Sequence, residues 1–329
     1  MDVHGKQVLV VGAGIAGLLC ATILRRGGAS VRVVEKGRGF GGRMATRRMA
    51  GARLDHGAQF FTVRTPEFAP WVEEWLRRGW IREWFRQAPW DSTPGGHPRY
   101  CGINGMTDVA KGLAGDLEVL RSTRIRSARW SPAGWVCADD TGEEHGADIL
   151  VLTAPVPQSA ALLEKSGIRL PAGDRERMRA IGYEPCLTAL LVLDGPSGLP
   201  EPGGVKPAEG PAAWIGDNSR KGISPEVSAV TVHSTPAFAR AHWDSPDEVR
   251  LPLLLEAASQ HLSAAIAEAS LHRWRFNVPV SGPWEPGYYW SEEFALGLAG
   301  DGFGGPRVEG SAVSGIRLGE RLAVPGGAA

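Results

Sequence analysis

The sequence predicts an α/β protein in which a Rossmann-like domain is assembled from both ends of the chain and an α+β region of mixed or antiparallel sheet is inserted between them. Three observations support this fold class. A strand, a glycine-rich turn, a helix and a second strand follow one another between residues 7 and 35. A strand, a glycine-rich loop and a helix return after residue 295. The middle of the chain mixes alternating strands with amphipathic helices.

The first βαβ unit follows from apolar periodicity and turn residues. QVLVV (7–11) is a strand, and the next helix, with apolar residues four apart on one face, extends to about Arg26. Gly27 and Gly28 stand where a left-handed C-cap is expected. SVRVVE (30–35) then returns as a strand parallel to the first, so the helix is a crossover packed on a parallel sheet.

The middle of the chain carries weaker signals. Trp71 and Trp75 lie four apart on an amphipathic helix, which indicates core or domain-interface residues. Strands are expected within 123–130, 134–139, 147–155, 188–195, 227–235 and 272–280. Two helices precede the last of these strands, the second roughly from Leu251 to Ala269.

Composition excludes several classes of function. The 329 residues include 36 basic and 36 acidic side chains, so no net charge attracts the chain to nucleic acid or anionic lipid. We expect neither a signal peptide nor a membrane span. The cysteines lack a C-x-x-C pair, which indicates no metal site or redox dithiol and predicts reduced thiols in the cytoplasm. They are Cys20, Cys101, Cys137 and Cys186.

The first glycine-rich turn has the G-x-G-x-x-G spacing of a dinucleotide site between a predicted strand and helix. Gly12 makes the tight turn, Gly14 lets the backbone approach a pyrophosphate, and Gly17 lets the helix pack close to the strand. The helix N-terminus favours the phosphate charge. Glu35, 18 residues after Gly17, can accept the hydroxyls of an adenosine ribose. This motif alone leaves NAD and FAD both open.

The residues after Glu35 favour a flavin. The Gly-Gly-Arg turn at 41–43 adds a cation suited to the flavin side of a diphosphate, although Arg43 could also be a solvated surface charge. In LDHGAQFF (54–61), the backbone of Gly57 and Ala58 could lie against a flat ring that Gln59 hydrogen-bonds. A nicotinamide domain has no need of this second stretch.

These residues resemble the flavin-containing amine oxidase superfamily, whose members carry a dinucleotide turn, an acid and then a G-G-R turn. The resemblance narrows to the renalase-like FAD oxidoreductases, particularly the bacterial group, and covers nearly the whole chain, most loosely between 195 and 230. The segments that carry it are LDHGAQFFTVRTPEF (54–68), RYCGINGMTDVAKGLA (99–114), HRWRFNVP (272–279) and LAGDGFGGPRVEGSAVSG (298–315).

The resemblance implies a tightly but non-covalently bound FAD. Asp301 would meet the ribityl and phosphate region, the helix opened by residues 308–310 would point at the flavin, and the backbone of Ile125 would meet the adenine. Ser311 and Asn104 stand where the family pattern has alanine and proline. The cofactor-binding residues expected are Gly12, Ala13, Gly14, Ile15, Ala16, Gly17, Glu35, Lys36, Gly41, Gly42, Arg43, Met44, His56, Gly57, Ala58, Gln59, Ile125, Gly300, Asp301, Val308, Glu309 and Gly310.

Weaker sequence signals indicate the residues that could line the substrate site. Hydride transfer requires the donor carbon to be held over the flavin more than it requires an acid or a base. His233 could contact ligand or be a satisfied structural histidine, and Trp284 could stack on a ring or seal the pocket. Arg273 and Trp274 could be purely structural. The catalytic candidates are Gln59, Tyr100, His233, His242 and Trp284.

The predicted FAD-binding domain comprises residues 1–74, 101–156 and 285–329, and the substrate domain comprises 75–100 and 157–284.

Three functions remain open. The first is a renalase-like oxidase that passes a hydride from 2- or 6-dihydro isomers of NAD(P)H to FAD and electrons to O2, giving H2O2. The second is a flavin amine oxidase acting on a small amine, and the third is another FAD-dependent role, such as a desaturase or a non-catalytic flavin-binding partner. Amine oxidases usually place a lysine near flavin N5. The lysines after Lys36 offer no obvious candidate; they are Lys111, Lys165, Lys206 and Lys221.

Overall fold

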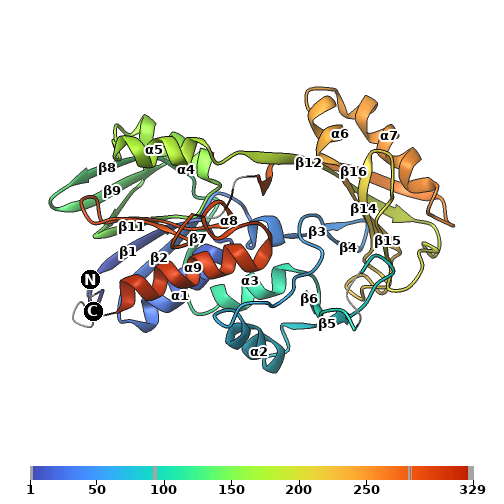
Figure 1. The fold of residues 1–329 in the computed structure, drawn as a ribbon, viewed down its shortest axis with the longest axis horizontal. Coiled ribbons are helices and arrows are strands. Elements are labelled where there is room, and N and C mark those ends of the chain that lie inside the picture. Colours follow the sequence, from blue (N-terminus) through green and yellow to red (C-terminus); the bar gives the residue numbers. More distant parts are fainter. Residues whose placement is uncertain (1–2, 92–94, 281, 283, 325–329) are drawn as a thin grey trace.

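The computed structural model describes residues 3–91, 95–280, 282 and 284–324. Two principal sheets lie toward opposite ends of an elongated molecule, and helices cover both (Figure 1). Both termini lie at the end that holds the larger sheet (Figure 1). This arrangement separates the sheet built from the two ends of the chain from the sheet built by its middle.

The larger sheet has six strands in the order β17-β18-β11-β1-β2-β7, and every neighbouring pair is parallel except β17 with β18. Its central strands are short apolar runs, as expected of a parallel sheet that is buried on both faces. The strands are β1 (Gln7–Val11), β2 (Ser30–Glu35), β7 (Glu118–Arg121), β11 (Ile149–Leu152), β17 (Tyr289–Ser291) and β18 (Leu296–Leu298).

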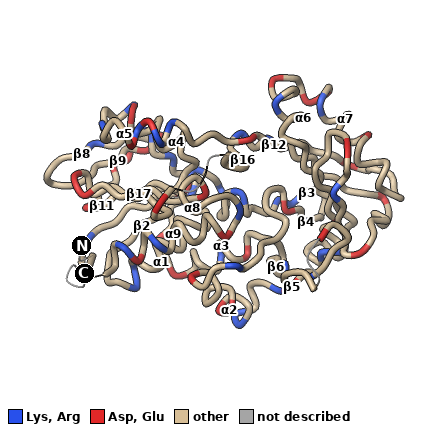
Figure 2. The backbone as a smooth tube through the Cα atoms, in the orientation of Figure 1, with Lys and Arg blue, Asp and Glu red and all other residues tan. Residues whose placement is uncertain are grey.

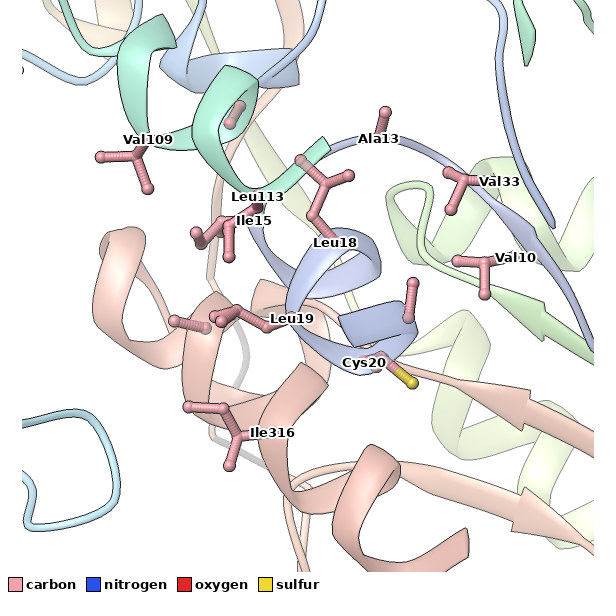
Figure 3. Packing of buried hydrophobic residues seen from close by; sticks show 14 of the residues in the cluster. Val10, Ala13, Ile15, Leu18, Leu19, Cys20, Val33, Val109, Leu113 and Ile316 are labelled. Atoms are coloured by element: carbon pink, nitrogen blue, oxygen red, sulfur yellow. The ribbon is translucent and has the colours of Figure 1, made fainter. Parts of the chain in front are cut away.

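The first and last helices, α1 (Ile15–Arg26) and α9 (Arg307–Ala323), pack directly against each other. A Cβ at Gly315 of α9 would come within 3.0 Å of the backbone of Ala16, so only glycine permits this approach. Leu19 of α1 and Ile316 of α9 belong to the same buried cluster (Figure 3). The two ends of the chain therefore form one core, as the sequence predicts.

The smaller sheet is antiparallel, in the order β13-β14-β15-β12-β16. One face carries alternate apolar residues such as Leu187, Ala189 and Leu191, which helix α7 (Asp247–Ser259) covers. Helix α6 (Pro236–Ala241) packs near β12 (Figure 1). The strands are β12 (Tyr183–Leu193), β13 (Gly204–Val205), β14 (Ala212–Asp217), β15 (Ala229–Ser234) and β16 (Ile266–Pro279).

Shorter elements connect the two sheets. Hairpin β3–β4 contacts β15 of the smaller sheet, and strands β8 to β10 form a separate three-stranded sheet. These elements are η1 (Gly42–Met44), β3 (Thr46–Met49), β4 (Ala52–Asp55), α2 (Ala69–Arg77), β5 (Ile81–Phe85), β6 (Arg99–Gly102), α3 (Thr107–Ala114), β8 (Ile125–Ser131), β9 (Gly134–Asp139), β10 (Glu144–Ala147), α4 (Val156–Lys165), α5 (Ala172–Arg179) and α8 (Asp301–Gly304).

One predicted helix boundary was wrong. The helix expected to extend to Ala269 ends at Ser259, and the chain from Ile266 onward is already strand β16. The alanine-rich stretch SAAIAEAS favours helix by intrinsic propensity. Pairing with β12 along almost the whole of β16 overrides that preference.

The expected core position of Trp75 is confirmed, because its side chain is fully buried with Phe61 and Phe68. Helices α4 and α5 lie within the segment predicted as substrate domain. Leu163 and Met178 from these helices pack in a core cluster with residues of β8 and β9. The limits of the two domains stay a prediction.

Basic and acidic positions are interspersed along the backbone (Figure 2). Within the described ranges, no helix is long and apolar enough to cross a membrane.

The contact between α1 and α9 leads to a prediction about stability. Gly315→Ala should lower the free energy of unfolding by about 3 kcal/mol, because the new methyl group overpacks the interface with Ala16. Gly173→Ala is the matched control: it also lies in a helix, α5, but an added Cβ there meets no atom within 4 Å. Urea unfolding should show the control unchanged or stabilised by less than about 1 kcal/mol. Equal stability of both variants would refute the tight interface.

Candidate functional site

The first glycine turn has the geometry that its spacing predicts. Gly12 has φ +116°, and Gly17 packs so close to the carbonyl of Gly12 that a Cβ there would come within 3.0 Å of it. Thr153, which the sequence motifs do not indicate, supports the turn through hydrogen bonds from its hydroxyl to the carbonyls of Val11 and Gly12. A Cβ at Gly14 would meet no atom within 4 Å, so its backbone is open to a ligand.

Glu35 lies at the end of β2, beside this turn. Its carboxylate accepts hydrogen bonds from the backbone N–H of Ala13 (2.9 Å) and Gly37 (2.7 Å), which orient it. A carboxylate has further acceptor sites, and these suit ribose hydroxyls. The next residue, Lys36, donates to Gln158 of α4 (3.0 Å). Burial lowers the pKa of Lys36, and the Glu35 carboxylate partly offsets this effect.

The second glycine turn joins the first. The N–H of Gly41, at φ +98°, donates to the carbonyl of Ala13 (2.9 Å), which brings η1 beside the first turn. The following Gly57 and Ala58 lie against Arg43: the N–H of Ala58 donates to the Arg43 carbonyl (2.8 Å), and a Cβ on Gly57 would collide with it. The two turns and the 57–58 backbone therefore form one continuous surface.

Arg43 is tied to the far end of the chain rather than solvated. Its guanidinium makes two hydrogen bonds to Asp301, one of them 2.8 Å long, and donates to the carbonyls of Phe276 and Asn277. The Tyr183 hydroxyl donates to Asp301 (3.1 Å). Burial and the Asp301 carboxylate together raise the pKa of Tyr183. No sequence motif singled out Tyr183.

The C-terminal glycine loop places the N-terminus of α9 next to Arg43 and Asp301. Gly300 has φ +140° and donates its N–H to the Ser314 hydroxyl (2.9 Å), and Gly304 contacts the backbone of Gly310. The side chain of Glu309 accepts hydrogen bonds from Arg64 and Thr65, so it holds the loop at residues 64–65 against α9. Val308 beside it is buried.

A polar row on the smaller sheet faces the segment 55–59. Cross-strand pairing aligns Trp214, His233, Thr188 and His272 across β14, β15, β12 and β16. Directly paired residues share one face of a sheet, so this row lies opposite the apolar face that α7 covers. The row includes one sequence candidate, His233; the other three emerge only from the strand register.

His56 links the row to the segment 55–59. The indole N–H of Trp274 donates to the His56 carbonyl (2.7 Å), and the two rings stack at 5.2 Å. The ring of His272 packs edge-on against His56 at 4.8 Å. The His56 backbone raises the pKa of His233, so the ring of His233 lies close to it. Trp274, for which the sequence left a purely structural role open, therefore belongs to this cluster.

Three polar atoms around this segment are buried and have no hydrogen-bond partner: His56 Nδ1, Gln59 Oε1 and His233 Nε2. The Gln59 amide nitrogen is engaged, donating to the carbonyls of Asp55 (2.6 Å) and Gly57 (3.1 Å). Buried polar atoms in native proteins nearly always have partners, so three orphans around one stretch of backbone indicate a missing ligand.

The two histidines are uncharged at neutral pH. Burial and, to a smaller degree, the Lys221 ammonium lower the pKa of His233 to about 4, although the His56 backbone acts in the opposite direction. Burial lowers the pKa of His56 to about 3, with smaller effects in the same direction from His272 and Arg47. Neutral imidazoles can accept a hydrogen bond, which imidazolium ions cannot.

Lys221 is the residue that the sequence analysis missed. It looked like a loop lysine, but its side chain is fully buried and its ammonium lies 2.5 Å from Asp55. The ammonium also lies over the ring of Trp84, 5.3 Å from its centroid. Lysines are scarce in the middle of the chain, and only this scarcity could have drawn attention to Lys221.

The other candidates lie in different surroundings. Tyr100 packs against Phe61 and pairs with Glu83 in the β5–β6 hairpin. His242 caps α6 and packs on Phe238. Neither has a described contact with the 55–59 segment.

Trp284 packs against Phe303 and Tyr289 under the guanidinium of Arg177. Ile125 is buried at the start of β8. Ligand contacts for these residues and for Tyr100 and His242 stay predictions.

Comparisons with known proteins agree with this geometry. Residues 10–78 match the family described as NAD(P)-binding Rossmann-like domain. Mouse renalase (Mus musculus) is 27% identical over 191 residues, which is 54% of this chain and 55% of that protein. The chain thus matches about half the length of this curated relative.

Solved structures share the fold along nearly the whole chain. A protein crystallised as a candidate protoporphyrinogen oxidase from Exiguobacterium sp. 255-15 has a TM-score of 0.74 at 13% identity, covering 97% of this chain and 98% of its own. Putrescine oxidase bound to putrescine has a TM-score of 0.71 at 16% identity, with the same coverages. The family model shows a Rossmann-like domain at residues 10–78, and the two solved structures show that the chain shares their fold.

Proposed function

We propose that the chain is a renalase-like FAD-dependent oxidase that accepts a hydride from the uncharged dihydronicotinamide ring of 2- or 6-dihydro isomers of NAD(P)H. The partial match to renalase suggests the reaction class. The observation that carries the proposal is the set of three buried, unpartnered polar atoms around residues 55–59. The four free, buried cysteines are compatible with a reducing compartment, so the proposal includes the cytoplasm.

The residues present fit FAD. The open backbone at Gly14, beside the N-terminus of α1, suits a diphosphate, and Glu35 suits the adenosine ribose. Arg43 and Asp301 lie together farther along the same surface, where the ribityl chain and the flavin-side phosphate would lie. We therefore assign FAD to the surface formed by both glycine turns, residues 57–58 and the N-terminus of α9.

When bound, FAD would supply the acceptor for the donor's hydride, which carries both electrons, and O2 would take two electrons and two protons to leave as H2O2. The protein's own residues would bind and orient the donor and exclude water from it. Gln59 Oε1 and His233 Nε2 can accept the N–H bonds of a carboxamide, and the stacked rings of His56 and Trp274 offer a flat apolar wall. These contacts would hold a planar donor ring in place without a charged side chain.

The charges around the 55–59 segment favour an uncharged donor ring over an ammonium ion. Both buried imidazoles are neutral, and the carboxylate of Asp55 is already occupied by Lys221, Thr46 and the N–H of Met106. Among the described residues that touch the 55–59 segment, none offers a free carboxylate to a cation. Oxidation of a small amine remains the alternative, because putrescine oxidase shares the fold.

The assignment of the diphosphate predicts the behaviour of one substitution. Gly14→Val should leave the apoprotein folded, since its Cβ meets no atom within 4 Å, but should weaken FAD binding at least about tenfold by blocking the backbone approach. Gly39→Val, in an equally open loop position, is the control and should retain FAD. Flavin titration by fluorescence measures both affinities, and equal affinities would contradict the assignment.

A donor panel tests the reaction itself. The yellow protein is mixed without oxygen with NADH, NADPH, their 2- and 6-dihydro isomers and primary amines, while the flavin absorbance is followed. We expect rapid bleaching by the isomers and formation of H2O2 when oxygen is admitted. Bleaching by an amine with no response to the isomers would overturn the proposal, and a chain that could not be loaded with FAD would overturn every flavin function.

The neutral imidazoles predict a pH profile. The rate of flavin reduction should be flat between about pH 5.5 and 8 and should fall only as the pH approaches the lowered pKa of His233, about 4, where protonation removes the acceptor. A step between pH 6 and 7 that disappears in His233→Gln would show that His233 titrates normally. His97→Gln, at an exposed loop position, is the control and should keep the wild-type profile.

A further inference from the structure

The ion pair between Asp55 and Lys221 is the most deeply buried charge pair among the described residues, with side-chain exposures of 0% and 1%. Both Asp55 oxygens are engaged: one accepts from the Thr46 hydroxyl (2.6 Å) and the Met106 N–H (2.9 Å), and the other accepts from Lys221. Replacing such a pair with apolar residues often costs no stability. Its presence therefore calls for a reason other than stability alone.

Lys221 lies in an anchor turn, residues 217–224, that connects β14 to β15 and docks on the other half of the molecule. Asn218 accepts the backbone N–H of Asp55 (3.2 Å), and Ser224 accepts that of Arg53 (3.3 Å). A guanidinium nitrogen of Arg82 donates to the Lys221 carbonyl. The anchor turn thus holds strand β4, which leads directly into the 55–59 segment.

The same pair stands beside the polar row. Thr231, two residues before His233 on β15, donates to the Asp55 carbonyl (3.0 Å), and the ring of His233 lies close to the backbone of the next residue, His56. Lys221 and His233 therefore flank the Asp55–His56 peptide. The titratable groups that face His233 are Lys221 from the anchor turn and Asp55 and His56 from β4 and its extension.

We propose that Lys221 is a positioning residue of the substrate site: with Asp55 it fixes the 55–59 segment against the smaller sheet, and its positive charge adds to the effect of burial in disfavouring protonation of His233. The description of this region as a substrate site rests on the proposed function. The electrostatic effect does not, because it concerns only residues of this chain. Lys221 acts through His56, Gln59 and His233 and need not touch the donor.

Proton NMR titration of the histidine ring signals tests the charge effect in the FAD-loaded protein without any donor. In wild type, the His233 signal, assigned by its loss in His233→Gln, should not titrate above about pH 5. Lys221→Gln should raise the pKa of His233 by about 1 or more, into the observable range, because the repelling ammonium is gone. Asp55→Asn should leave the pKa at or below the wild-type value, because the ammonium then acts unopposed.

These opposite expectations separate a charge effect from simple loosening of the fold. Loosening would admit water and raise the pKa of His233 in both variants, so equal increases would overturn the proposal. An unchanged pKa in Lys221→Gln would overturn it as well. If the single variant does not fold, the double variant Asp55→Asn/Lys221→Met, which leaves no unpaired buried charge, should show the same increase. Lys206→Gln, an exposed lysine, is the matched control and should behave as wild type.

Hydrogen exchange tests the positional part of the proposal. Amides of residues 55–59 should exchange at least about tenfold faster in Lys221→Gln than in Lys206→Gln, while those of α1 remain protected. Unchanged exchange at 55–59 would refute the anchoring role. Neither this result nor the titration depends on the donor, so failure of the dihydronicotinamide assignment would be distinguishable from failure of the role of Lys221.

Discussion

Backbone contacts that only glycine allows shape the two ends of the chain and join them, and the proposed cofactor site depends on these contacts. Gly315 lies on Ala16 and joins the two ends, whereas Gly17 on Gly12 and Gly304 on Gly310 are contacts within each end. These contacts place the N-termini of α1 and α9 on the same side of the six-stranded sheet. Arg43 and Asp301, 258 residues apart, then meet across the surface between them.

The second half of the site is supplied by the five-stranded sheet, whose two faces have different tasks. One face is apolar and carries α7, which stabilises the sheet. The other presents Trp214, His233, Thr188 and His272 in one row toward the 55–59 segment. The Asp55–Lys221 pair joins the two halves at this point. In the proposed function, the residues that hold FAD and the residues that suit an uncharged donor ring therefore come from different parts of the chain.

Local patterns made much of the fold predictable. The first βαβ unit, the second glycine turn and the opening of α9 near Val308 follow from turn residues and apolar periodicity, which act over a few positions. The end of α7 was misjudged because strand pairing, a distant interaction, outweighed the helix propensity of an alanine-rich stretch.

The substrate side was harder to predict for the same physical reason. Lys221 has the sequence surroundings of a surface loop, and its partner Asp55 lies 166 residues away. Thr188, His272 and Tyr183 are ordinary strand residues until the register brings them beside His233 or Asp301. No spacing rule encodes such contacts, whereas the diphosphate turn is encoded by three glycines within six residues.

The central claim is that one surface, built from both ends of the chain, holds FAD with its flavin ring toward the 55–59 segment. A crystal structure of the yellow protein as purified tests this most directly. The account predicts FAD with its diphosphate at Gly14, its adenosine ribose on Glu35 and its ring beside Ala58 and Gln59. FAD bound elsewhere, or a nicotinamide coenzyme occupying the turn in its place, would contradict it.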